Sequence, residues 1–239
     1  MAQNTGNAKN ILVGASPLFI SNFDVTSGSY VENAEPGSAA AGAFATGVSY
    51  TNTLNAITPG NTFAYRNVGF TNNGLQITYN PTYDSVTVDQ LLDTAKLFKS
   101  AMEVMIATEM SEGTLENVLV VFGQADDPTE NTTLSANNTI IESGTGTSKK
   151  TTLGLAAGAL GVAPTERQLV AVGQAPTSSA TKTERVYYAR RVLSVQQSQF
   201  TLSRAAATTF PVTFRLLPTA MSGYEGQEYG KIIDRVLVA

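Results

Sequence analysis

The last third of the chain has the clearest pattern of hydrophobic and polar positions. Four runs there are rich in β-branched and apolar residues and are separated by turn residues: 168–173, 185–196, 208–217 and 231–238. Such runs predict β-strands, because branched side chains pack well on a pleated surface. Pro211 lies in the third run and predicts an edge position or a bulge, since proline has no N–H to donate to a neighbouring strand.

Strand signals in the N-terminal part are weaker. Residues 10–21 (NILVGASPLFIS) are apolar but contain a glycine and a proline, which predicts an edge strand interrupted by a bulge or turn. Runs at 62–68 and 75–79 flank the sequence Asn-Asn-Gly at 72–74. Asparagine and glycine accept the positive φ angles that tight turns require, so we expect a β-hairpin here.

The stretch 86–123 fits two patterns. Apolar residues at helical spacing follow a Thr87/Gln90 capping box and predict one long amphipathic helix: Val88, Leu91, Leu92, Ala95, Phe98, Met102, Met105 and Ile106. The second interpretation divides the stretch into strand, short helical connection, strand and helix: 84–89, 91–100, 102–110 and 115–122. We favour the second, because Gly113 followed by a capping threonine, Thr114, indicates that a new helix begins there.

The predicted helix at 115–122 has its own start and stop signals. Thr114 is the expected N-cap, and Gly123 is the expected C-terminal stop. Four side chains of this helix are expected to pack on a sheet: Leu115, Val118, Leu119 and Phe122.

Two long polar segments interrupt these elements. Residues 24–47 are rich in Ser, Gly and Ala without periodicity, which predicts a flexible loop or arm. Residues 124–165 contain one apolar pair, Ile140-Ile141, and predict a long loop insertion. The whole pattern predicts a mainly β single domain over 1–239, an antiparallel β-sandwich or barrel with one flanking α-helix and long loops.

Composition removes several classes of chemistry. The 239 residues include no cysteine and no histidine, which excludes thiol nucleophiles, disulfides, Cys/His zinc sites and Ser-His-Asp triads. Three carboxylate pairs lie in Gly/Pro-rich surroundings typical of solvated loops: Glu32/Glu35, Asp126/Asp127 and Glu225/Glu228. The loop 143–150 has no glycine directly before its lysines, unlike a phosphate-binding loop. We therefore expect no enzyme activity and no catalytic, cofactor-binding or metal-ligating residues.

Charge is unevenly distributed along the chain. Residues 1–148 carry four Lys/Arg and 14 Asp/Glu, a net charge of −10, whereas 149–239 carry 11 and five, a net charge of +6. Either oppositely charged surfaces associate, or strands from both halves interleave and the asymmetry disappears in the fold. Five arginines of the C-terminal part suggest nucleic-acid readout or inter-subunit ion pairing, and the acidic net charge favours pairing: Arg185, Arg190, Arg191, Arg204 and Arg215.

The sequence contains no membrane or export signal that we recognise. The first ten residues, MAQNTGNAKN, are polar, and the apolar small-residue run at 153–163 has about half of the roughly 20 residues that a membrane-spanning helix needs. We therefore expect neither export by the general secretory route nor association with a membrane.

Several segments together are similar to one protein family. They are SVTVDQLLDTAKLFK at 85–99, EGTLENVLVVFGQ at 112–124, APTERQLVAVGQAP at 163–176, ERVYYARRVLSVQQ at 184–197, TTFPVTFRLLP at 208–218 and YGKIIDRV near the end. In this order they resemble the major tail protein, or tail tube subunit, of long-tailed, non-contractile bacteriophages. ILVGASPLFIS near the N-terminus is similar to the first strand of that family.

The resemblance implies a self-assembling virion protein. It implies that six copies form a ring whose inner strands join into a barrel, and that rings stack head to tail through extended loops and arms. Double-stranded DNA would pass through the channel without sequence-specific binding. Implied partners are the tape measure, distal tail and terminator proteins. The implied location is the virion tail, after synthesis in the bacterial host cytoplasm.

A second hypothesis is a monomeric β-sandwich binding module of a virion, such as a receptor-binding or capsid-decoration domain. For the first hypothesis, we expect the acidic part of one subunit to meet the basic part of another. Arg190 and Arg191 are either interface residues of this contact or internal to the fold. We also expect residues 126–152 to become ordered only against a neighbouring subunit.

Overall fold

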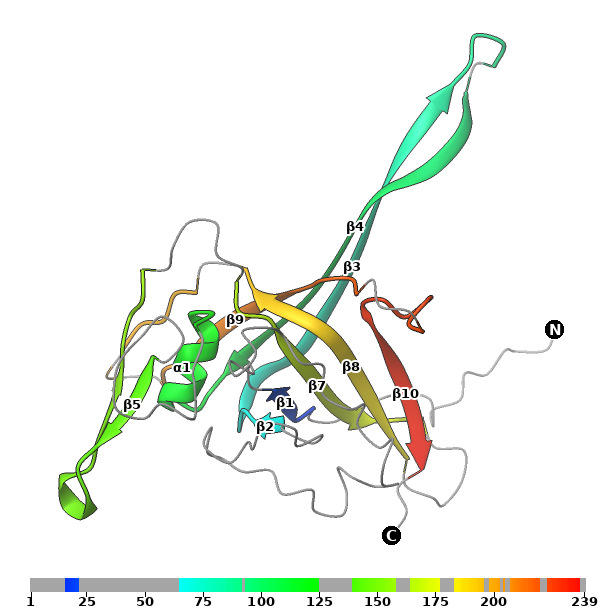
Figure 1. The fold of residues 1–239 in the computed structure, drawn as a ribbon. Helices are drawn as coiled ribbons and strands as arrows, with labels where there is room; N and C mark the ends of the chain where they lie inside the picture. The colour runs from blue at the N-terminus through cyan, green and yellow to red at the C-terminus, as the bar shows by residue number, and fades with distance from the viewer. Residues whose placement is uncertain are drawn as a thin grey trace.

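The structure is a computed structural model that describes residues 16–21, 65–91, 93–124, 139–157, 164–176, 183–195, 198–202, 204, 207–219 and 223–236. The described residues form ten β-strands, one α-helix and a short 3-10 helix (Figure 1). The fold is mainly β, as expected from the sequence.

Eight strands form one large antiparallel sheet. Their bounds are β1 Leu18–Ser21, β2 Tyr65–Asn67, β3 Thr71–Thr87, β4 Thr94–Met110, β7 Arg167–Gln174, β8 Thr183–Ser194, β9 Phe210–Leu216 and β10 Gly230–Val236. The strand order is β2-β1-β7-β8-β9-β4-β3, and β10 pairs with β8 beside this path. A second, two-stranded sheet consists of β5 Ile140–Ser143 and β6 Lys150–Leu153, joined through the 3-10 helix η3 Gly146–Ser148. This arrangement establishes the β class, whereas the sandwich remains a prediction.

The four C-terminal strands confirm the sequence pattern. All four predicted runs are strands, and they become β7, β8, β9 and β10. Pro211 pairs with Glu109 of β4, whereas β8 pairs only with residues 214–216 of β9. At Pro211, β9 therefore has one strand neighbour in the described part of the chain. The absent N–H of Pro211 removes no hydrogen bond to β8.

The core lies mainly on one face of the large sheet. Alternate residues of β9 are buried, among them Val212 and Phe214, and they pack with Leu169 of β7 and Leu119 of the helix. A smaller buried cluster on β1, β7 and β8 contains Phe19, Val170, Val186 and Tyr188. Five successive residues of β7 are buried, because both of its faces are covered.

Helix α1, Leu115–Val121, begins and ends as the sequence predicts. Thr114 Oγ1 accepts a hydrogen bond from the Asn117 N–H at 3.3 Å, which caps the first turn. At the other end Gly123 has φ +66°, and Gly123 and Gln124 donate to the carbonyls of Val120 and Leu119. This pair of bonds is a Schellman motif. In the described residues no helix has the length and apolarity to cross a membrane.

The helix face differs in part from the prediction. Leu119 is fully buried, and Leu115 and Val118 pack against the core as expected. Phe122 is 41% exposed, while Val120 and Val121 occupy core positions that we did not predict. Phe122 is the C-cap residue, so its side chain leaves the helix beyond the last turn that faces the sheet.

The expectation of a β-hairpin turn at 72–74 is wrong, although the expected positive φ angles do occur there. Asn73 and Gly74 have φ values of 61° and 67°. The chain does not reverse there, because both residues lie within β3, where the register with β4 shifts between Asn72 and Gln76. Thr108 Oγ1 donates to the Gly74 carbonyl at 2.8 Å and stabilises this bulge. Positive φ angles serve bulges as well as turns.

Three further expectations need correction. Residues 94–100 belong to β4, so neither the long helix nor the helical connection at 91–100 exists. β1 lies between β2 and β7 and is not an edge strand. The expected loop 124–165 contains the β5–β6 hairpin. The segments 24–47 and 126–138 lie outside the described residues.

Candidate assembly surface

The distal parts of β3 and β4 leave the sheet as a two-stranded arm that begins at the pair Tyr79–Val104. β9 pairs with β4 only from Met105 to Met110, so the arm's strands pair only with each other among the described residues. Figure 1 shows this arm as a long twisted ribbon that extends away from the body. The described side chains from 82 to 101 are all exposed. The arm therefore adds little to the core of the chain.

One face of the arm is apolar, and its root is in the core. Directly opposed residues of an antiparallel pair share a face. Ile77 is opposite Ile106 and Tyr79 is opposite Val104, and both partners on β4 are buried. Farther out, this face continues with Tyr83, which is opposite Lys99, and with Leu97, which is opposite Ser85.

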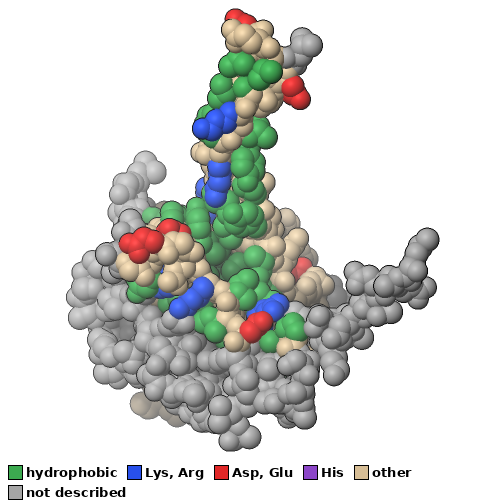
Figure 2. Space-filling view, turned by 90° about the vertical axis from the view of Figure 1, so that its right-hand side faces the viewer, with side chains coloured by type: hydrophobic (Ala, Val, Ile, Leu, Met, Phe, Trp, Pro, Cys, Tyr) green, Lys and Arg blue, Asp and Glu red, His purple; other side chains and the backbone are tan. Residues whose placement is uncertain are grey.

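We call Ile77 at the root and Tyr79, Tyr83 and Leu97 farther out the apolar face of the arm. Their exposed fractions are 44, 65, 56 and 63%. Figure 2 shows hydrophobic side chains along the arm from the body toward the tip. Contiguous exposed apolar surface is uncommon on soluble monomers and is typical of interaction sites.

Bulges shape the arm. Beyond the bulge at Gly74, the register between β3 and β4 shifts again between Thr82 and Tyr83 and between Val86 and Thr87. Each bulge increases the local right-handed twist and interrupts the edge. A twisted, interrupted edge is a poor template for unspecific strand pairing, so the arm's side chains rather than its backbone edges are the better candidates for contact.

A buried polar network fixes the region below the arm's root. Asn117 of α1 is fully buried, and its Nδ2 donates to the carbonyls of Val68 and Glu112, both at 2.9 Å. Its Oδ1 accepts from Arg66 Nη1 at 2.7 Å. One amide therefore joins β2, the β4–α1 connection and the helix.

Arg66 is less well satisfied than Asn117. Its Nε and Nη2 are buried without a hydrogen-bond partner. Burial lowers the pKa of Arg66, and the nearby carboxylates of Glu116 and Glu112 oppose this shift. A charge in this position depends on Asn117, because the amide oxygen provides the shortest hydrogen bond that the guanidinium makes.

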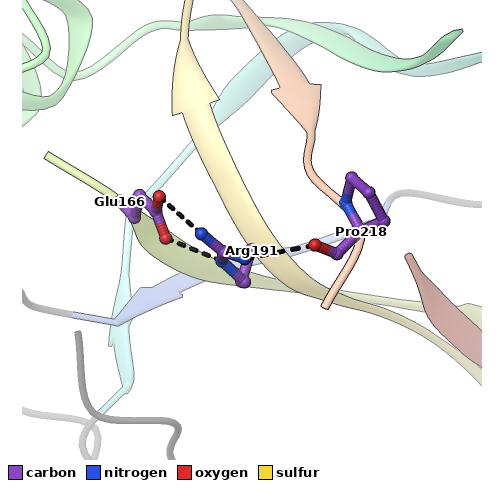
Figure 3. A network of polar contacts seen from close by, with 3 residues as sticks. All are labelled: Glu166, Arg191 and Pro218. Atoms are coloured by element: carbon purple, nitrogen blue, oxygen red, sulfur yellow. Dashed lines mark hydrogen bonds and ion pairs between the residues drawn. The ribbon is translucent and has the colours of Figure 1, made fainter. Parts of the chain in front are cut away.

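The C-terminal arginines form contacts within the chain. Arg191 donates from Nε and Nη2 to the two carboxylate oxygens of Glu166, each at 2.7 Å, and from Nη1 to the Pro218 carbonyl at 3.1 Å (Figure 3). Arg185 binds Asp234 of β10 in the same two-pronged way, at 2.6 and 2.7 Å. Planar guanidinium groups suit such paired bonds to carboxylates.

Arg190 is also internal. Only 3% of this residue is exposed, and its Cζ lies 3.7 Å from the centre of the Tyr224 ring. Its Nη2 donates to Gln227 Oε1 at 3.0 Å. Of the two alternatives for Arg190 and Arg191, a subunit interface or a place inside the fold, the structure favours the second for Arg190, and Arg191 is bound by Glu166 and Pro218. Of the remaining two arginines, Arg204 is exposed and Arg215 is 3.8 Å from Glu103 at the root of the arm.

The carboxylate pairs do not converge where the structure describes them. Glu228 Oε1 accepts the Gly226 N–H at 2.9 Å, and this bond lowers the pKa of Glu228. Its neighbour Glu225 is exposed. The other two pairs lie outside the described residues. Within the described part, no group of three or more carboxylates is arranged to hold a metal ion.

The loop 143–150 forms the tip of the β5–β6 hairpin. Gly144 has φ +82°, and a Cβ atom there would lie 2.3 Å from the Ser148 carbonyl oxygen, so the turn requires glycine. Lys149 and Lys150 are exposed at this tip. A phosphate-binding loop connects a strand to a helix, and this turn connects two strands.

No protein-family model matches this chain, and no curated protein matches it significantly. The apolar face of the arm is a candidate functional feature that the sequence patterns did not lead us to predict. Its signal was present as alternation of Ile77, Tyr79 and Tyr83 with polar residues. We assigned part of that run to a short strand and the rest to a separate element, which concealed its length.

Proposed function

We propose that this protein is a structural virion protein that self-assembles into stacked hexameric rings and forms a phage tail tube, which conducts the genome during ejection. The observation that supports this proposal is the arm. An extended two-stranded ribbon with an exposed apolar face has an unfavourable contact with water, at roughly 25 cal/mol for each Å². Association that covers this face removes that contact.

Self-association agrees with the asymmetry of the molecule. The arm projects from one side only (Figure 1), so a copy that receives it must do so with a different surface. Such heterologous contacts generate rings or open stacks. The resemblance to tail tube subunits supplies the rest of the proposal: six copies in a ring, head-to-tail stacking, and a channel for double-stranded DNA that is not read by sequence.

The proposal has consequences for partners and location. The protein would be made in the bacterial host cytoplasm and would function in the virion tail. Its other partners would be the tape measure, distal tail and terminator proteins. It would have no enzymatic role, and it would not use a metal, a cofactor or a membrane.

The test is the state of association of the purified chain. We expect rings or tubes by negative-stain microscopy and light scattering after concentration. A monodisperse 25.2 kDa species at high concentration would contradict the proposal and favour the monomeric binding module instead.

Matched variants link assembly to the arm. Tyr79→Ser with Leu97→Ser removes two exposed side chains of the apolar face and should abolish assembly while leaving the circular dichroism spectrum unchanged. Leu202→Ser removes a side chain of comparable exposure outside the arm and is the control.

A further inference from the structure

Two β-hairpins project from the body in different directions. One is the arm, whose outermost pair is Thr87 and Thr94, and the other is the β5–β6 hairpin, whose outermost pair is Ser143 and Lys150. Figure 1 shows the tip of the arm at one end of the molecule and the β5–β6 hairpin at the opposite end. Both therefore remain accessible to another copy approaching along this direction.

The two tips have opposite charge. The sequence 87–95 contains Asp89 and Asp93 and no Lys or Arg, and both aspartates are exposed. The outer part of the β5–β6 hairpin, 144–151, contains Lys149 and Lys150, both exposed, and the one acidic residue of the hairpin, Glu142, lies one pair below, opposite Thr151. Opposite charges at two surfaces steer association and select the matching orientation.

Apolar side chains accompany the charges at both hairpins. On the arm, Val88 and Leu91 are exposed between and beside the two aspartates. At the foot of the other hairpin, Leu155 is 76% exposed. The residues directly before the two lysines, 144–148, are Gly, Thr, Gly, Thr and Ser, and their small side chains allow close approach of a second ribbon.

From these observations we infer that the arm tip of one copy binds the β5–β6 hairpin of the next copy, with Asp89 and Asp93 paired with Lys149 and Lys150. Because the two hairpins lie at opposite ends, the contact repeats from copy to copy without closing on itself. The inference rests on the proposed function and specifies the contact between successive rings. Exposed ion pairs are individually weak, but six equivalent contacts in each ring act together.

Because the chain contains no cysteine, disulfide cross-links can form only between cysteines that are introduced. The variant Asp93→Cys with Lys150→Cys should give, under oxidation, a ladder of covalent multimers on a non-reducing gel. Each single variant should stop at dimers. The control pair Asp93→Cys with Gln174→Cys uses an exposed position on β7 and should give no ladder.

Charge reversal tests the same contact without cysteine. Asp89→Lys with Asp93→Lys, and separately Lys149→Glu with Lys150→Glu, should each slow assembly by about tenfold. An equal mixture of these two variants should recover assembly, because each arm then finds an oppositely charged hairpin on the other variant.

The outcomes separate the inference from the proposed function. If the wild-type chain forms tubes, but the paired cysteines give no ladder and the mixture assembles no faster than either variant alone, the hairpin contact is wrong and the tube remains. If the wild-type chain stays monomeric, both are wrong.

Discussion

At the scale of single residues, the buried polar groups are the positions where we expect substitution to be least tolerated. Asn117 is an example, since it makes three hydrogen bonds to groups from three segments in a place without water access. Buried donors and acceptors are costly to leave unpaired. Its neighbour Arg66 depends on it for the same reason.

Replacement of Asn117 should therefore destabilise the protein strongly. Asn117→Ala removes the hydrogen bonds to two buried carbonyls and leaves Arg66 with the longer, 3.4 Å bond to the Asn67 carbonyl, and we expect the free energy of unfolding to fall by about 3 kcal/mol or more. Urea unfolding followed by circular dichroism measures this change. Asn80→Ala is the control, because Asn80 is exposed on the arm, and it should change stability by less than about 0.5 kcal/mol.

A second residue-scale prediction concerns pH. The Arg185 guanidinium holds the pKa of Asp234 below its usual range, chiefly through their hydrogen bonds. A carboxyl whose pKa is lowered by folding stabilises the protein above its unfolded pKa, and this contribution disappears as the pH falls through the folded pKa. The stability difference between wild type and Asp234→Asn should therefore begin to shrink at about pH 4 and vanish once the pH is below the folded pKa of Asp234. A difference that persists unchanged at low pH would show that the ion pair is not its cause.

At the scale of elements, local interactions determine where helix α1 begins and ends, and tertiary packing determines which of its side chains are buried. Its caps follow from residues within one turn of each end, while its buried face follows from where the sheet lies. The consequence is that Leu119 is fully buried although Phe122, which the helical period places with it, is not.

This difference can be measured by truncation. Leu119→Ala should cost about 3 kcal/mol, because it leaves a cavity in the core, and Leu119→Asp should unfold the chain. Phe122→Ala removes a larger but half-exposed side chain and should cost less than Leu119→Ala. Thermal and urea unfolding of the three variants decide the order. Equal losses for the two alanine variants would mean that both side chains are core residues.

The β5–β6 hairpin allows a test at a single backbone position. Gly144→Ala should distort the turn, since the new Cβ would meet the Ser148 carbonyl. Gly146→Ala is the matched control, because it also has a positive φ but nothing within 4 Å of the new Cβ. We expect faster amide exchange over 150–153 in the first variant than in the second. Similar exchange in both would show that the close approach does not limit the turn.

At the scale of the whole molecule, the body and the arm have separate roles. The body contains the core, and the arm projects from it with almost no buried side chain. We expect a molecule built in this way to fold through its body, and we propose that it associates through its arm.

Removal of the arm should therefore separate folding from assembly. Replacing residues 81–102 with Asn-Gly joins Asn80 to Glu103, which are cross-strand partners, through a favourable two-residue turn. We expect the melting temperature to change by only a few degrees and the capacity to form rings or tubes to be lost. Calorimetry and negative-stain microscopy on the same samples check both parts. Tubes formed by the shortened chain would exclude the arm as the assembly element.

The sequence by itself determined the features that depend on neighbours along the chain. Strands β7 to β10 follow from runs of branched residues, and both ends of α1 follow from Thr114 and Gly123. These signals act within a few residues, so no distant contact is needed to interpret them. The mainly β class follows from the same runs.

Only the tertiary structure decided the features that depend on distant partners. The apolar residues of 94–106 fit a helical period in the sequence, and pairing with β3 makes them a strand. The same pairing turns Asn73 and Gly74 into a bulge rather than a hairpin turn. Arg190 is internal because Tyr224 and Gln227, more than thirty residues away, close over it. Long-range pairing selects among local alternatives of similar free energy, and a sequence pattern does not contain that selection.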